Sequence, residues 1–163
     1  MKPTPAKVSP TRARSPGLLE ESVYDALAQA KILTSAVAMH LERVWRDKFF
    51  WQLDMLHRLD EWEADDQPVR LESIGTFLRA MMAVRPQRHP GLSLGRTGNL
   101  IAAWTSGDDR LTLEFRTENS VRAVLAVNEE NKVDRAVLDT SAARLPRVLA
   151  PYDPSRWFGI RDQ

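Results

Sequence analysis

Three histidines are the first side chains in this sequence that could hold a metal ion or transfer a proton. His40, His57 and His89 lie in separate segments. Two histidines share a metal ion on one helix face when they are about four residues apart, and no pair here has that spacing. The spacing therefore predicts surface or half-buried histidines and no metal site.

Carboxylates gather in the segment DEWEADDQ at residues 60–67, directly before Pro68. Acid–base catalysis by paired carboxylates requires two of them to face one reacting group. Consecutive acids at a helix end point in different directions into water, so this pattern predicts a solvated helix end. The sequence also has no cysteine, and no serine has the surroundings of a nucleophile elbow. We therefore expect a protein that is not an enzyme and that uses no cofactor.

A loop is predicted at residues 87–98, QRHPGLSLGRTG, because of its glycines and its proline. Its end, Gly95 to Gly98, has some likeness to a phosphate-binding loop. It lacks the Lys-Ser/Thr pair and the preceding strand on which phosphate binding depends. A small-ligand site or an active site near this loop is the second of two alternatives for the function.

Composition predicts one globular domain. The chain has 163 residues, of which 43% are hydrophobic and 28% charged, and this length allows a sizeable core. No stretch approaches the roughly 20 apolar residues that a membrane-spanning helix needs. The lack of cysteine is compatible with a reducing cytoplasm, where we expect the protein to act.

The composition of residues 1–16 predicts a disordered basic arm. The segment carries four basic side chains and no acidic one, and proline is frequent in it, so it cannot bury enough apolar surface to become ordered. A nucleic-acid-binding regulator is the first alternative for the function. It would use arm residues together with arginines of the predicted strands: Lys7, Arg12, Arg14, Arg110, Arg116 and Arg122.

The segment from Leu18 to Gln67 is free of glycine and proline and predicts helix. Apolar positions repeat at intervals of three and four residues and line one helix face. They are Val23, Leu27, Ala30, Thr34, Val37, Leu41 and Val44. The pattern is compatible with one long helix and also with a helical hairpin. A further helix is predicted at 71–84, with Ile74, Phe77, Leu78 and Met81 inward.

The segment from Gly98 to Val127 predicts three strands joined by tight turns, and Val133 to Asp139 a weaker fourth. Leu111, Leu113 and Phe115 alternate with polar residues, so one face of this strand is expected to be buried and the other wet. Trp104 and Phe115 share faces with aliphatic residues, which predicts core packing. Two aromatic residues near the C-terminus, Trp157 and Phe158, predict a tail that docks on the domain.

Aromatic residues concentrate in the helical segment, which suggests an interaction surface. Two interpretations stand side by side: the aromatic residues pack on the sheet, or they meet a partner protein or a second copy of the chain. We take partner binding as the main functional hypothesis, with self-association through the N-terminal helices as a further possibility. The candidate contact residues are Leu27, Val37, Leu41, Trp45, Phe49 and Trp51.

A sequence resemblance to other proteins covers residues 53–127. The motif is a leucine-rich helix end with Trp62-Glu63, then a second short helix, and then Gly98, Trp104 and the strand Leu111-Thr112-Leu113-Glu114-Phe115. This order resembles a loose set of small uncharacterised bacterial proteins, some of them encoded beside toxin or defence genes. The resemblance implies a non-enzymatic antitoxin or immunity-type neutraliser that binds a toxin or defence component, and it implies no catalytic residues. The relatives usually carry Trp-Asp and a Gly-rich turn after the first helix, where this chain has Trp62-Glu63-Ala64.

Together these patterns predict an α+β fold, with N-terminal amphipathic helices packed on a three- to four-stranded antiparallel meander. Two layers are the simplest arrangement in which one-sided helices and one-sided strands bury each other's apolar faces. The expected organisation is an arm at 1–16 and a single domain at 17–163. Within the domain we expect a helical part at 17–84, the meander at 98–139 and a C-terminal cover at 140–163.

Overall fold

A computed structural model describes residues 16–37, 41–63 and 65–159. The predicted disorder of residues 1–15, and the positions of Lys7, Arg12, Arg14 and His40, concern residues outside this part of the chain, whereas Pro16, the last residue of the predicted arm, begins a helix.

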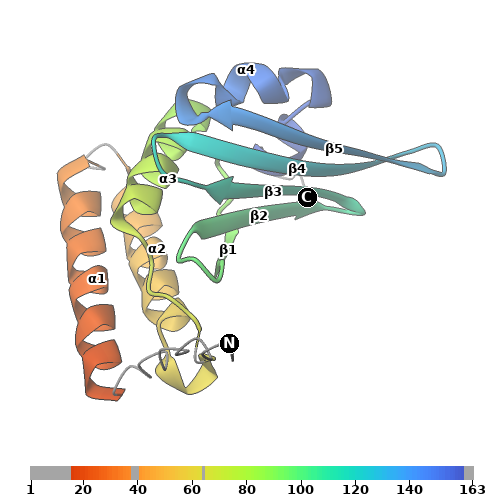
Figure 1. Cartoon of the computed structure of the whole chain (residues 1–163). Helices are drawn as coiled ribbons and strands as arrows, with labels where there is room; N and C mark the ends of the chain where they lie inside the picture. The colour runs from red at the N-terminus through yellow and green to blue at the C-terminus, as the bar shows by residue number, and fades with distance from the viewer. Residues whose placement is uncertain (1–15, 38–40, 64, 160–163) are drawn as a thin grey trace, which may run out of the picture.

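The chain folds as α+β, as predicted, with helices preceding an antiparallel meander (Figure 1). The sheet has five strands in the order β1-β2-β3-β4-β5, each antiparallel to its neighbours. The strands are β1 Gly91–Leu94, β2 Leu100–Ser106, β3 Asp109–Phe115, β4 Ser120–Glu129 and β5 Lys132–Ser141.

The first strand corrects the prediction of a loop over residues 87–98. β1 is only four residues long and lies between Pro90 and Gly95, so local sequence favours a turn. Pairing with β2 makes it a strand, with Leu92 opposite Ala102. Both leucines of β1 pack against the core, which gives the short strand its stability.

The faces of the meander agree with the predicted alternation. The side chains of Leu111, Leu113, Phe115 and Leu100 are fully buried. Trp104 is 2% exposed. Two glycines make this geometry possible. Gly107 has φ +61 in the β2–β3 turn, and Gly98, with φ +83, lies so close to the carbonyl oxygen of Pro68 that an added Cβ would be only 2.3 Å from it. Glycine adopts positive φ at the least cost, and at Gly98 a side chain would also meet the Pro68 carbonyl.

The helical part divides into separate helices, so the hairpin and not the single long helix is present. They are α1 Pro16–Val37, α2 Arg43–Leu56 and α3 Leu71–Val84, with a short 3₁₀ turn, η1, at Leu59–Glu61. The hydroxyl of Thr34 donates to the carbonyl of Ala30 one turn earlier within α1. α2 runs through residues 46–48 without a break.

The core lies between α3 and the inner face of the sheet. Ile74, Phe77, Leu78 and Met81 are fully buried, as predicted for the inward face of this helix. α1 packs on α3 and α2 at the side away from the sheet (Figure 1). Buried Ser73 also joins helix to sheet, because its hydroxyl donates to the carbonyl of Phe115 and accepts from the amide of Leu100.

The C-terminal segment covers the remaining inner face. It forms η2 Ala142–Arg144, α4 Leu145–Leu149, η3 Ala150–Tyr152 and α5 Ser155–Phe158. Trp157 is fully buried and Phe158 is 8% exposed, so the tail docks as predicted. The Arg88 guanidinium reaches carbonyls of both this tail and β2, and Trp104 Nε1 donates to the Arg88 carbonyl.

Candidate binding cleft at the ends of α2 and α3

A cleft of about 770 Å³ lies where α2 begins and α3 ends. Ligand pockets commonly have volumes of about 300–1,000 Å³, so its size is adequate for a bound group. Apolar side chains form most of its wall, and Glu42, Arg85 and Gln87 add polar groups. The apolar lining residues are Leu41, Trp45, Met81, Met82 and Pro86.

Local sequence explains how the two sides of the cleft are placed. Leu41 and Glu42 directly precede α2, and Trp45 lies in its first turn. On the other side, α3 ends at Val84, and Arg85 adopts a left-handed conformation with φ 48 while its amide donates to the carbonyl of Met81. Such a residue commonly ends a helix, and the following proline prevents its continuation. Both walls therefore consist of helix ends.

Trp45 is held against the core rather than free in solvent. Its ring centroid lies 6.0 Å from that of Phe77 and 5.8 Å from that of Phe49. It lies 4.8 Å from the imidazole of His89. A tryptophan fixed in this way presents a rigid edge to the cleft, which lowers the entropy lost when a partner binds.

The rim of the cleft is also held in place by the C-terminal tail. The backbone amides of Gln87 and Arg88 both donate to the carbonyl of Phe158, at 2.8 and 3.2 Å. Since Phe158 is buried against the sheet and stacks edge-on with Trp104, the segment after α3 cannot shift without disturbing the core. This rim of the cleft is thus tied to the core.

The structure brings together two of the six residues predicted to contact a partner. Leu41 and Trp45 both line the cleft. Leu27 and Val37 are half-buried and pack against the core from α1. Trp51 is 60% exposed and is not among the residues that line this cleft.

Phe49 corrects the predicted surface, because it is fully buried. Its ring lies 4.9 Å from that of Phe77, centroid to centroid, so it belongs to the core. Sequence reasoning did not identify Met82 as a surface residue and assigned Met81 to the core alone. The pair of methionines at the end of a helix was the available signal, because flexible thioethers suit adaptable binding surfaces.

Two of the three strand arginines, Arg116 and Arg122, are paired with carboxylates, whereas Arg110 is exposed. Arg122 makes two hydrogen bonds to the carboxylate of Asp139, at 2.9 and 3.2 Å, and Arg116 pairs with Glu114 at 3.0 Å. The pKa of Asp139 is lowered, chiefly by the hydrogen bond from Arg122, and that of Glu114 is lowered because bonds from Asn99 and Arg116 outweigh its burial. The charges of these arginines are therefore balanced on the same face, which disfavours phosphate binding.

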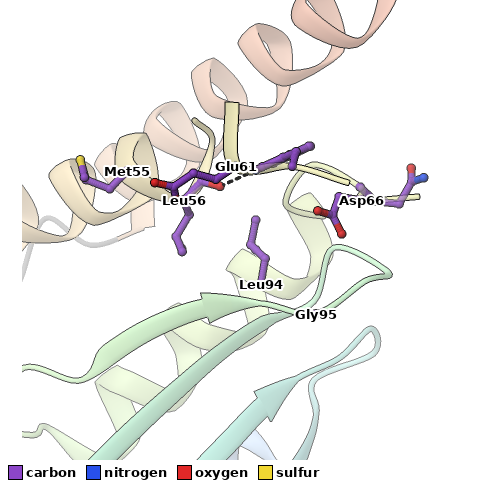
Figure 2. A pocket seen from close by; sticks show the side chains of 8 residues that line it. Met55, Leu56, Glu61, Asp66, Leu94 and Gly95 are labelled. Atoms are coloured by element: carbon purple, nitrogen blue, oxygen red, sulfur yellow. Dashed lines mark hydrogen bonds between the residues drawn. The ribbon is translucent and has the colours of Figure 1, made fainter. Parts of the chain in front are cut away.

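A smaller pocket of about 210 Å³ lies at the far end of β1, near the loop considered for a ligand site (Figure 2). Leu94 points from the strand toward the segment that carries Leu56, and the carboxylate of Asp66 lies at its edge. Asp66 already accepts the amide of Glu63, at 2.8 Å. The volume is below the usual range for a ligand pocket, so the larger cleft is the better candidate.

Two of the three histidines, His57 and His89, lie in the described part of the chain and are at least half-buried. His57 is buried, with 5% of its surface exposed, whereas the spacing predicted a surface or half-buried side chain. Its Nδ1 donates to the carbonyl of Leu53 at 2.7 Å, and its Nε2 accepts the amide of Val69 at 3.1 Å. Burial is the main reason that the pKa values of His57 and of half-buried His89 are both lowered.

Within residues 16–37, 41–63 and 65–159, no group of three or more His, Asp or Glu side chains is arranged to hold a metal ion. No helix in that part of the chain combines the length and apolar character needed to cross a membrane. Comparison with protein-family models, curated proteins and solved structures finds no match.

Proposed function

We propose that this chain is a non-enzymatic protein-binding module whose partner inserts apolar side chains into the cleft between α2 and α3. The observation that carries the proposal is the lining, in which Leu41, Trp45 and Met82 meet at the surface on a rigid core. Interfaces are enriched in aromatic residues and methionine at their centre, and anchoring side chains bind in such pockets.

The polar groups of the cleft indicate the chemistry of the partner. Glu42 lies on the α2 side and Arg85 on the α3 side of a wall that is mostly apolar. An amphipathic segment with apolar residues toward the cleft and charged residues at its margins would match this arrangement. The charges would set the orientation of the segment, and the apolar contacts would provide most of the affinity.

The sequence resemblance extends the proposal to the class of partner. Because some proteins of the set that this chain resembles are encoded beside toxin or defence genes, we propose that the partner is a toxin or defence component and that binding neutralises it. We place this activity in the cytoplasm, with which the lack of cysteine is compatible.

The experiment is capture of the partner from the cells that encode this chain, at high salt, with matched variants. Met82→Glu puts a charge into the cleft at a half-buried position. Val44→Glu puts the same charge on α2 at a side chain that is 78% exposed and outside the lining. Leu41→Glu changes the opposite wall and serves as a second cleft variant if Met82→Glu unfolds.

The expected result is one protein retained by the unchanged chain and by Val44→Glu and lost with either cleft variant, when circular dichroism shows all of them folded. Equal retention by all folded variants would place the interface elsewhere. If the unchanged chain retains no protein, the proposed function is wrong.

A further inference from the structure

β5 is a long edge strand of the sheet, and α4 has contacts with it. It spans ten residues, Lys132–Ser141, and within the described residues no strand lies beyond it. The hairpin that it forms with β4 extends past the turn between β2 and β3 (Figure 1). Exposed strand edges offer unpaired amide and carbonyl groups, which can pair with another chain.

The hairpin geometry identifies which groups of β5 face this edge. Glu130 and Asn131 form a two-residue turn with φ 44 and 71, closed by the pair Glu129 and Lys132. In such a hairpin the closing residues are a hydrogen-bonded pair, and hydrogen-bonded pairs then recur at every second position. The amide of Ala142, which donates to the carbonyl of Asn119 at 2.9 Å, continues the same alternation.

The odd-numbered residues of β5 therefore direct their amide and carbonyl groups away from β4. They are Val133, Arg135, Val137 and Asp139, with Ser141 at the end of the strand. Their side chains lie on the outer face of the sheet, opposite to the helices, because Val137 is in register with Val124 and Asp139 with Arg122. Val137 is 61% exposed, Val133 52% and Val124 41%, so this edge carries apolar surface.

We propose that β5 pairs antiparallel with β5 of a second copy of this chain, about a two-fold axis at Val137. In this register Arg135 lies opposite Asp139 of the second copy, and by symmetry Asp139 lies opposite its Arg135. Opposite charges directly across two strands stabilise a sheet. The axis also joins residues whose backbone groups both face the edge, as hydrogen bonding requires.

Other two-fold registers lack this match. An axis at Arg135 would put two arginines face to face, and an axis at Asp139 two aspartates, both of which are unfavourable. With an axis at Ala136 or at Leu138, both charged residues, Arg135 and Asp139, would lie opposite uncharged residues. These are valines or Ser141. The charge pattern of the strand thus selects one register.

The same register continues two rows of side chains across the joined sheet. Thr112, Val124 and Val137 are neighbours in register within one copy, so the row would pass through Val137 and Val124 of the second copy. In the next row, Glu114, Arg122 and Asp139 alternate in charge, and Arg135 of the second copy would continue the alternation. Asp139 would then lie between two arginines.

This pairing does not depend on the proposed function, because β5 contributes no residue to the cleft at α2 and α3. It also puts self-association on the sheet edge and not on the N-terminal helices, where the sequence suggested it. The two proposals can fail separately: partner capture tests the cleft, and the mass of the purified chain tests β5.

The test is the mass of the purified full-length chain by light scattering after size exclusion, over a series of concentrations. The expected species has twice the chain mass of 18.5 kDa. Arg135→Asp makes both facing pairs repulsive, as does Asp139→Arg, and each is expected to raise the dissociation constant at least about tenfold. Mixing these two variants restores opposite charges at both positions and should give a mixed dimer.

Two further variants separate the edge from general effects. Val137→Pro removes an amide that faces away from β4, so the hairpin keeps its own hydrogen bonds while the second copy loses a donor. Arg110→Asp makes the same charge change as Arg135→Asp on the outer face of β3, at an exposed side chain, and should leave the dimer intact.

A chain that stays monomeric at all concentrations would overturn the proposal. So would a dimer that persists with both folded charge variants, or charge variants that remain monomeric when mixed. Circular dichroism establishes that each variant is folded. If Val137→Pro unfolds, the mixing experiment still decides the register.

Discussion

Replacement of His57 by glutamine should remove a measurable part of the pH dependence of stability. The amide of Val69 donates to Nε2 at 3.1 Å, so Nε2 is unprotonated and the proton is on Nδ1, which donates to the carbonyl of Leu53 at 2.7 Å. Protonation would turn Nε2 into a second donor that faces the amide donor. The folded state therefore requires the neutral ring.

The sign follows from the direction of the pKa shift. Burial lowers the pKa of His57 in the folded state below the ordinary value of 6.5. The unfolded chain then binds more protons than the folded chain between these two values. The contribution of His57 to stability is fully present above pH 6.5 and is lost as the pH falls from 6.5 through the folded pKa.

The size of the effect has an upper limit. At pH 5.5, one unit below the ordinary pKa of 6.5, a ring that stays neutral in the folded state costs about 1.4 kcal/mol of stability relative to high pH. At pH 7.5, His57→Gln should lower the free energy of unfolding by about 1–3 kcal/mol, because it disturbs two buried hydrogen bonds. This difference should shrink by up to about 1.4 kcal/mol at pH 5.5.

Urea unfolding of both proteins at pH 7.5 and 5.5 measures the two differences. His89 also has a lowered pKa, chiefly because of burial, but it is present in both proteins and cancels in the comparison. An equal difference at the two pH values would refute the reasoning, because it would mean that His57 binds protons equally well in the folded and unfolded chains.

Five other substitutions, in three tests, probe the packing. Gly98→Ala should destabilise by more than about 2 kcal/mol in thermal or urea unfolding, because its Cβ would meet the Pro68 carbonyl, whereas Gly107→Ala, with positive φ but nothing within 4 Å, should cost only about 1 kcal/mol. Equal costs would contradict the close approach. Ser73→Ala should cost about 2–4 kcal/mol by leaving the Leu100 amide and the Phe115 carbonyl without this partner; a loss below about 0.5 kcal/mol would show that the link is unimportant. Phe49→Ala should cost about 3–5 kcal/mol and Trp51→Ala under about 1 kcal/mol in the same assay, in line with their burial, and the reverse order would return Phe49 to the surface.

Residues with a strong local period were predictable from sequence. α3 spans Leu71–Val84, as expected, and its inward residues are those of the predicted stripe. β3 shows the same agreement, since Leu111, Leu113 and Phe115 are buried and alternate with more exposed neighbours. In both cases one face of a single element meets the core, so the pattern is written in consecutive residues.

The cleft was predictable only in part. Leu41 was a candidate because it lies on the apolar stripe of the helical segment, and Trp45 because of the aromatic density within α2, but the second argument also included Phe49, which lies four residues after Trp45 and faces the core. Whether an apolar residue on a helix faces a core or a cleft depends on what packs beside it. The opposite wall, Met81 and Met82, comes from another helix, and its approach to α2 cannot be read from the sequence between them.

The sequence by itself determined the α+β class, the helix over 71–84, the buried faces of β2 to β4 and the docking of the C-terminal aromatics. Each depends on patterns a few residues long. Tertiary structure decided the separation of α1 from α2, the strand β1, the neutral state of His57, the pairing of Arg122 with Asp139 and the cleft. These depend on groups far apart in the chain: β1 is a strand because β2 lies beside it, and His57 is neutral because the Val69 amide faces its ring.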